Sequence, residues 1–200
     1  MDLLLNILAA CDAFDALMFA TGRRPNSEQL GLAGAGVDTD AGGRIVVDAK
    51  QDTSAEGVHA VGDVTDRIEL TPVAIAAARR LMDRLFGGQP EAVLDYGNVP
   101  TVVFAHPPLG MVGLTEDEAR MRFGDGEVQV YRSSFRPMLH ALPDVPMRST
   151  FKLVCAGDER RVVGLHLLGD GAEEILQGFA VALKRGITLA DLHDTIAIHP

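Results

Sequence analysis

The stretch of residues 58–79 constrains this chain more than any other segment. It opens with the short apolar run Val-His-Ala-Val, and Gly62 and Asp63 follow at once. A strand that ends in Gly-Asp can turn sharply and leave one carboxylate at its carboxyl end, where open α/β sheets bind ligands. Farther on, Thr71 and Pro72 predict a helix start, with Thr as the N-cap and Pro at the first helical position. We therefore expect a fixed carboxylate close to a positively polarised helix end.

This pairing suits one kind of ligand. An ionised aspartate only accepts hydrogen bonds, so Asp63 fits the hydroxyl groups of a sugar alcohol. The helix end at Thr71 fits negative charge, so the two together favour a large polyhydroxylated cofactor that must hold negative charge. An ordinary turn aspartate and simple helix capping are the alternatives that these residues leave open.

Composition narrows the class of protein. The chain has 200 residues, 47% of them hydrophobic, and a formal net charge of −10. The negative charge argues against non-specific binding to nucleic acid or to an anionic membrane surface. The apolar start is too short to span a bilayer, and Asp2 stands where a secretory signal would carry a cation. Cys11 and Cys155 form no metal-ligand or redox spacing, so we expect a cytoplasmic protein without a metal.

The pattern changes near residue 90, where we place a domain boundary. Before it, strands are expected at 14–20, 44–48 and 58–61, and a helix at 71–86. The helix buries a face on which apolar residues recur every fourth position: Val73, Ala77, Leu81 and Leu85.

Beyond residue 90, strands dominate, which is typical of an α+β domain. We expect strands at 101–104, 111–114, 127–135, 150–156 and 162–168. A capping box at Thr115 predicts one helix, and a possible second box at Asp170 and Glu173 predicts another over 171–185, ended by Gly186. This second helix is apolar nearly all round, so we expect it to be buried, at a subunit interface.

Several short motifs occur in a set order along the chain. They lie at residues 20–26 (Ala-Thr-Gly-Arg-Arg-Pro-Asn), 61–63, 70–77, 100–108, 112–116, 177–182 and 198–200. Each is weak alone, but the ordered set resembles the pyridine-nucleotide disulfide oxidoreductases, and among them the glutathione reductases most of all. The resemblance covers residues 13 to 200. It implies an unmatched start at 1–12, the carboxyl-terminal part of a Rossmann-like FAD/NAD(P)-binding domain (α/β) at 13–90, and an α+β dimerisation domain at 91–200, truncated at its end.

The resemblance also implies roles for residues around the cofactors. Asp63, after Gly62, would bind the ribitol of FAD, and the Thr71 backbone would bind the flavin ring. The nicotinamide nucleotide, NADPH by resemblance alone, would lie near these further residues: Gly22, Arg23, Glu69 and the carbonyl of Val102.

On the substrate side, Arg79 and Thr71 would face a disulfide whose carboxylates suit a guanidinium fork. Met138 would contact the substrate from the partner of a homodimer. Ala78 and Leu139 depart from the Gly and Tyr usual in glutathione reductases, which narrows the space beside Arg79 and puts an aromatic contact in doubt.

His199 would be the general acid–base that protonates the leaving thiolate. A lone histidine near a terminus is more often structural, so only the surrounding match supports this role. The other histidines are expected to pack in strands (His59, His166), to begin a turn (His106) or to be exposed (His140, His193).

The implied activity is NADPH-dependent reduction of glutathione disulfide through FAD and a redox dithiol. The dithiol and the nucleotide fingerprints would lie upstream, so we expect the fragment alone to be inactive and to bind flavin weakly or not at all. The residues Arg79 and 135–138 favour glutathione as substrate. The alternatives are a sister reductase for lipoamide, trypanothione or mercuric ion, and a non-catalytic dimerisation remnant.

Overall fold

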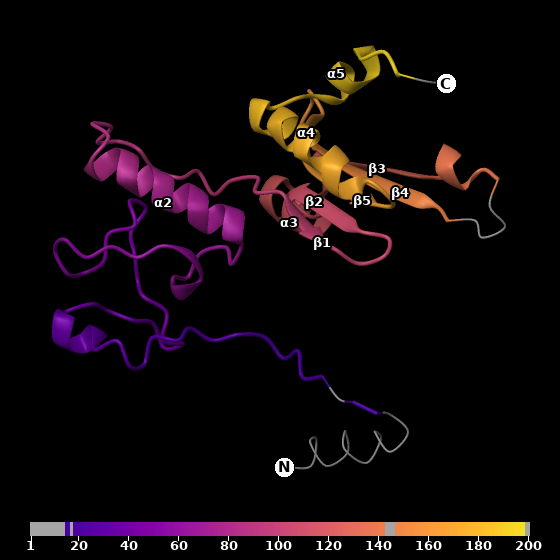
Figure 1. Cartoon of the computed structure of the whole chain (residues 1–200). Coiled ribbons are helices and arrows are strands. Elements are labelled where there is room, and N and C mark those ends of the chain that lie inside the picture. Colours follow the sequence, from indigo (N-terminus) through magenta and orange to yellow (C-terminus); the bar gives the residue numbers. More distant parts are fainter. Residues whose placement is uncertain (1–14, 17, 143–146, 199–200) are drawn as a thin grey trace. The chain divides into compact units, whose positions relative to one another are not determined.

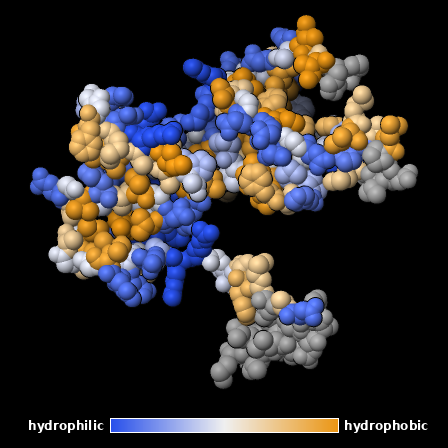
Figure 2. Space-filling model, in the orientation of Figure 1, coloured by the Kyte–Doolittle hydropathy of each residue, from blue (hydrophilic) through white to orange (hydrophobic). Residues whose placement is uncertain are grey.

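The chain forms two compact units, which are described separately below (Figure 1). The structure, a computed structural model, describes residues 15–16, 18–142 and 147–198. The first unit ends at Asp95 and the second begins at Tyr96. In the described residues, no helix is long and apolar enough to cross a membrane. Figure 2 shows hydrophobic residues among the polar ones on the visible surface of both units.

The first unit has α2 (Thr71–Leu85) and two short 3-10 helices, η1 (Leu32–Ala35) and η2 (Gly62–Val64). Helix α2 buries Val73, Ala77 and Leu81, as its four-residue periodicity predicts, whereas Leu85 at its end is exposed. The expected N-cap role of Thr71 is wrong. Leu70 is the N-cap and makes no side-chain cap, because the helix already starts at Thr71, one residue earlier than a Thr71 cap would require.

The strands expected at 14–20, 44–48 and 58–61 are wrong as continuous strands within the described residues. Only isolated bridges form there: Thr39 with Ile45, Ile45 with Thr65, and Asp52 with His59. A strand needs a neighbouring strand to pair with. Among the described residues, the run 44–48 is bridged only at Ile45, the run 58–61 only at His59, and no bridge forms within 14–20. The loops are held instead by a small buried cluster: Val37, Ile45, Val47 and Ala60.

A polar network attaches α2 to these loops. The Arg84 guanidinium donates to the Lys50 carbonyl (2.8 Å) and to the Asp52 carboxylate, which also pairs with His59 Nδ1 at 2.6 Å. Partial burial raises the pKa of Asp52, but the hydrogen bonds and charges of Arg84 and His59 outweigh it. The pKa of Asp52 therefore lies below its ordinary value of 3.8.

The second unit is a five-stranded antiparallel sheet of order β1-β2-β5-β4-β3. Its strands are β1 (Thr101–Val103), β2 (Leu109–Gly113), β3 (Val128–Phe135), β4 (Ser149–Ala156) and β5 (Arg161–Leu168). Each expected strand is present within a few residues of its predicted limits, and the α+β expectation is confirmed.

Two helices pack on opposite faces of this sheet. Because successive residues of a strand point to opposite faces, Cys155 joins the main core under α4 (Ala172–Arg185), while Val154 joins a smaller cluster under α3 (Glu116–Phe123). The main core is built from buried residues of the sheet and of the C-terminal helices: Val112, Cys155, Val162, Leu165, Leu167, Ala172, Leu176, Ala180, Leu183 and Leu189.

Helix α4 is not buried all round in this chain. It buries Leu176 and Leu183 against the sheet, but Ile175, Phe179 and Val181 are exposed. The expectation of all-round burial is therefore wrong for the single chain, because the sheet can cover only one face of the helix. The subunit interface on its other face stays a prediction.

The helix ends test the predicted caps. Thr115 and Glu118 form the expected capping box of α3, and Gly186 ends α4 in the left-handed conformation. The possible box at Asp170 is wrong, since Gly171 is the N-cap of α4 without a side-chain cap. A further helix, α5 (Leu189–Asp194), was not expected; Thr188 and Asp191 form its capping box.

Two glycines let β2 and β5 approach closely. Gly113 and Gly164 are register partners. A Cβ on Gly164 would lie 2.0 Å from the Leu114 oxygen, and one on Gly113 would lie 2.2 Å from the Val163 oxygen. Backbone atoms occupy both places, so neither position accommodates a side chain.

Candidate functional site

The Gly62-Asp63 turn is closely packed and hydrogen-bonded in the first unit. Val61 is extended and Gly62 has φ 78°, so the chain turns directly into η2. Thr65 is fully buried, and its hydroxyl donates to the Gly62 oxygen at 2.8 Å. A Cβ on Gly62 would lie 3.1 Å from the Ala74 Cβ, so the turn packs against the start of α2. This arrangement fixes the Asp63 backbone and leaves its carboxylate in solvent.

The amino end of α2 is open. No side chain caps its first turn in the described residues, and Pro72 lies in that turn. The first N–H groups of a helix have no partner within the helix and carry partial positive charge. The predicted pairing of a carboxylate with a positive helix end is therefore present in the structure.

A cavity of about 320 Å³ brings three predicted site residues together. Arg23, Asp63 and Glu69 line it, with Arg24, Pro25, Asn26 and Val64. Arg23 Nη1 lies 3.8 Å from Asp63 Oδ2, and both side chains are well exposed. An exposed pair at this separation contributes little to stability, which leaves both groups free to contact a ligand.

Glu69 has a partner that the sequence did not indicate. Arg44 Nη2 lies 3.2 Å from Glu69 Oε1, although the two residues are 25 positions apart. The Arg44 backbone N–H donates to Asp40 Oδ1 at 2.8 Å, which fixes the turn that carries this arginine. Gly22, also predicted here, is exposed and has φ 101°.

Arg79 differs from the arginines beside it on α2. Arg80 pairs with Asp83 at 3.0 Å, and Arg84 belongs to the Asp52 network. Among the described residues, no carboxylate lies within ion-pair distance of the exposed Arg79. Thr71 and Arg79 are eight residues apart, which is about 12 Å along a helix axis. Arg79 is thus an uncompensated cation on the helix whose amino end is open.

Two predicted residues belong to the second unit. Val102 lies in β1, at the edge of the sheet, and is partly buried against the main core. Met138 begins the 3-10 helix η4 (Met138–His140) and is 85% exposed. His199 lies outside the described residues.

The η4 turn is anchored in a way that the sequence did not predict. His140 Nε2 lies 2.6 Å from Asp170 Oδ2, and its side chain is only 14% exposed. The Arg136 guanidinium donates to the His140 carbonyl. The prediction that His140 is exposed is therefore wrong, because Asp170, 30 positions later, pairs with it.

Two other groups have no place in this site. Cys155 is fully buried, and burial raises the pKa of its thiol, so it is a core residue as expected. His166, half-buried in β5, has a pKa lowered by burial and by Lys152, which the charge of Glu118 opposes.

Comparisons with known proteins show which family the chain resembles. The profile "Pyridine nucleotide-disulphide oxidoreductase, dimerisation domain" matches residues 99–200, and "Pyridine nucleotide-disulphide oxidoreductase" matches residues 12–78. A glutathione reductase of Schizosaccharomyces pombe is 50% identical over 190 residues, which are 93% of this chain.

Solved structures give the same result. The HOCl-induced flavoprotein disulfide reductase RclA of Escherichia coli is 29% identical, with a TM-score of 0.77, and its Cu(II) complex is 30% identical, with a TM-score of 0.78. Both matches cover 93% of this chain and 42% of that chain. The chain likewise spans 40% of the length of the S. pombe reductase. By the profile that covers its second half and by these relatives, the chain belongs to the pyridine nucleotide-disulphide oxidoreductase family.

Proposed function

We propose that this chain supplies the ribitol, substrate and dimerisation parts of a cytoplasmic, FAD-containing reductase that reduces glutathione disulfide with NADPH. The observation that carries the proposal is the cavity that joins Arg23, Asp63 and Glu69 in the first unit. The 50% identity to a glutathione reductase supports this substrate.

The first unit fits a flavin in two respects. Gly62 allows the turn to pack against Ala74, and the open amino end of α2 offers N–H groups to an anionic ring. Asp63 would hold the ribitol hydroxyls, and the Thr71 backbone would hold the pyrimidine edge of the ring. When bound, FAD passes electrons from NADPH to a redox dithiol. The chain's own contribution is to orient the cofactor and to stabilise negative charge on it.

The nicotinamide nucleotide would lie beside Gly22, Arg23, Glu69 and the Val102 carbonyl. Arg44 holds Glu69 at 3.2 Å and so limits its rotamers at the edge of the cavity. We propose NADPH rather than NADH because the chain resembles the glutathione reductases.

On the substrate side, Arg79 would bind a carboxylate of glutathione disulfide and Thr71 would lie beside the disulfide. Met138 would reach the substrate of the partner subunit in a homodimer. His199 would protonate the thiolate that leaves when the disulfide is cleaved. The exposed apolar face of α4, with Ile175 and Phe179, supports a dimer formed through this helix.

We further propose that residues 13–90 belong to the FAD/NAD(P)-binding domain and residues 91–200 to the dimerisation domain. The profile matches at 12–78 and 99–200 support this division.

The test uses the full-length gene product and its Arg79→Met variant. Loss of the guanidinium should raise the KM for glutathione disulfide about 10- to 100-fold, as expected for a charged hydrogen bond. Arg80→Met is the matched control, because Arg80 pairs with Asp83, and it should leave KM unchanged. Retained activity with dihydrolipoamide but none with glutathione disulfide would reject this substrate.

A non-catalytic dimerisation module is the second candidate, and the exposed α4 face is the observation that favours it. Sedimentation of the 200-residue chain would detect the dimer. Dimerisation of the chain, together with a full-length product that reduces no disulfide, would favour the module over the enzyme.

A further inference from the structure

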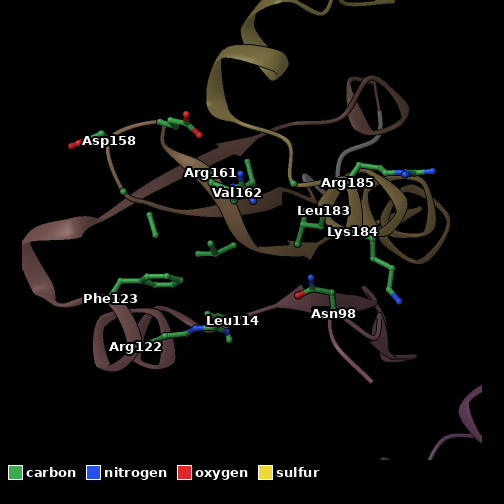
Figure 3. A pocket seen from close by; sticks show the side chains of 15 residues that line it. Asn98, Leu114, Arg122, Phe123, Asp158, Arg161, Val162, Leu183, Lys184 and Arg185 are labelled. Carbon is green, nitrogen blue, oxygen red and sulfur yellow. The ribbon is translucent and has the colours of Figure 1, made fainter. Parts of the chain in front are cut away.

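We propose that a cavity in the second unit, apart from the residues assigned above, binds a small planar aromatic anion. The cavity has a volume of about 680 Å³ and lies between the end of α3, the turn that joins β4 to β5, and the end of α4 (Figure 3). This volume is in the range of pockets that hold small molecules. None of its lining residues has a role in the proposed reductase, so the inference is independent of that function.

The cavity has an apolar floor. Val162 and Leu183 belong to the buried core and are 3% and 4% exposed, and Leu114 lies beside them. Phe123, the last residue of α3, is 39% exposed, and in Figure 3 its ring points into the cavity. An exposed aromatic ring over an apolar floor favours a flat apolar ligand.

Cations line two sides of this floor. The Arg122 guanidinium lies 5.3 Å from the centroid of the Phe123 ring, on the α3 side. Arg161, on the β5 side, lies against the end of α4, and the Asn98 amide points into the space between them (Figure 3). In the described part of the chain, neither arginine has a carboxylate within ion-pair distance.

The acidic residues of the cavity do not neutralise these arginines. Asp158 points outward from the β4–β5 turn in Figure 3, and Glu159 is exposed. Two guanidinium groups without a carboxylate partner therefore border one cavity, although the chain carries a net charge of −10. A guanidinium binds a carboxylate or phosphate through paired hydrogen bonds. The Phe123 ring and the two arginines, Arg122 and Arg161, together favour an aromatic ligand that bears one acidic group.

A purely structural role for Arg161 is the competing explanation. Its Nη1 lies 3.1 Å from the position of a Cβ on Gly186, the residue that ends α4. A cation at this end of a helix is stabilising without any ligand. The experiment must therefore separate ligand binding from the stability of α4.

The test is an NMR titration of the ¹⁵N-labelled 200-residue chain with 2-naphthoate, with 2-naphthyl phosphate as a second arm. We expect saturable shifts centred on the amides of Phe123, Gly157 and Gly186. The neutral 2-naphthamide has the same ring system and should bind about ten-fold more weakly or worse, because it lacks the charged hydrogen bonds. The tighter of the two anions identifies the acidic group as carboxylate or phosphate.

The variants separate the two explanations. Arg161→Ala and Arg122→Ala should each weaken naphthoate about ten-fold or more. Arg148→Ala makes the same change in charge on an exposed residue just before β4, at the end of that strand opposite the cavity, so binding should change less than about two-fold because exposed charges are screened. Arg122 lies on α3, so its variant tests binding without altering the end of α4.

Three results would overturn the proposal. Equal binding of naphthamide and naphthoate would show that charge has no role. Shifts centred on Ile175 and Phe179 would place the ligand on the exposed face of α4 instead. Loss of stability in Arg161→Ala without any change in naphthoate affinity would leave that arginine a helix-end residue only.

Discussion

The second unit holds five strands in one continuous sheet, whereas the described part of the first unit is joined mainly by turns, isolated bridges and side-chain contacts. Among the described residues, the main core cluster of the second unit has ten buried members, and the cluster in the first unit has four. Most of the proposed cofactor and substrate residues nevertheless lie in the first unit. We therefore expect the proposed cofactor and substrate residues to lie in the less stable of the two units, as is common where binding residues lie on loops.

The largest expected effect separates the two units directly. Leu176→Ala removes a side chain that is 1% exposed in the core of the second unit, which should cost about 2–5 kcal/mol of unfolding free energy. Hydrogen exchange should show lost protection in β2, β4 and β5, with unchanged exchange in α2. Ile175→Ala, on the exposed face of the same helix, is the control and should cost less than about 0.5 kcal/mol in the monomer. Equal loss of protection in both units would mean that they unfold together.

A second substitution tests the polar network of the first unit. Arg84→Met leaves the Asp52 carboxylate and the Lys50 carbonyl without this donor. The expected loss is about 1–2 kcal/mol of unfolding free energy, and it is modest because Asp52 is partly exposed to solvent. The loss should be confined to exchange in α2 and residues 48–61. Arg80→Met breaks an exposed pair on the same helix and should cost less than about 0.5 kcal/mol. A matching loss in both variants would mean that the network adds nothing.

Acid should begin to destabilise the second unit at a higher pH than the first, and carboxylates with lowered pKa values then add to the loss in both units. The pKa of His166 lies below its ordinary 6.5, chiefly through burial, so the unfolded chain takes up the proton first. The second unit should therefore lose stability as the pH falls below 6.5, down to the folded pKa. The pKa of Asp52 in the folded chain lies below 3.8. Its contribution to the stability of the first unit is therefore complete above pH 3.8 and is lost as the pH falls through that folded-state pKa.

The measurement is urea unfolding followed separately in each unit across this pH range. In the second unit, His166→Gln should remove the loss of stability that begins at pH 6.5. In the first unit, Asp52→Asn should reduce the dependence of the unfolding free energy on pH below 3.8. An unchanged pH profile in the His166 variant would show that its ring is not held neutral by the fold.

The smallest effect compares the helix starts of the two units. Thr115 caps α3 through its side chain, so Thr115→Ala should cost about 1 kcal/mol in the second unit. Thr71 follows the N-cap of α2 and makes no such bond, so Thr71→Ala should change stability by less than about 0.5 kcal/mol. Thermal unfolding of both variants checks this, and a larger loss for Thr71→Ala would show that it caps α2 after all.

The sequence predicted the second unit well because its apolar runs pair with neighbouring strands inside the same unit. The strand predictions for the first unit were wrong because strand propensity is a property of one run of residues. It does not indicate whether a neighbouring strand is available to pair with that run. Helix α5 was missed, although Thr188 and Asp191 carry a capping signal as readable as that of Thr115.

The candidate site shows the same limit. Asp63 and the helix at Thr71 were found because a Gly-Asp turn and a proline in the first helical turn are local patterns. The pairs Arg44–Glu69 and His140–Asp170 join residues 25 and 30 positions apart, so only the folded chain brings them together. The uncompensated charge of Arg79 could be recognised only when its neighbours were seen to have partners.

The facing glycines of β2 and β5 have a consequence for how the sheet assembles. A slip of two residues keeps the side chains on their correct faces, so hydrophobic burial alone discriminates poorly against it. Such a slip would place His166 or Val162 opposite Gly113, where Gly164 now lies. Either side chain would clash with the Leu114 carbonyl, because even a Cβ added to Gly164 would lie 2.0 Å from that oxygen. The pair of glycines therefore favours the correct strand register during folding, because shifted registers produce a steric clash. A family member with a side chain at either position would need a different backbone path between β2 and α3.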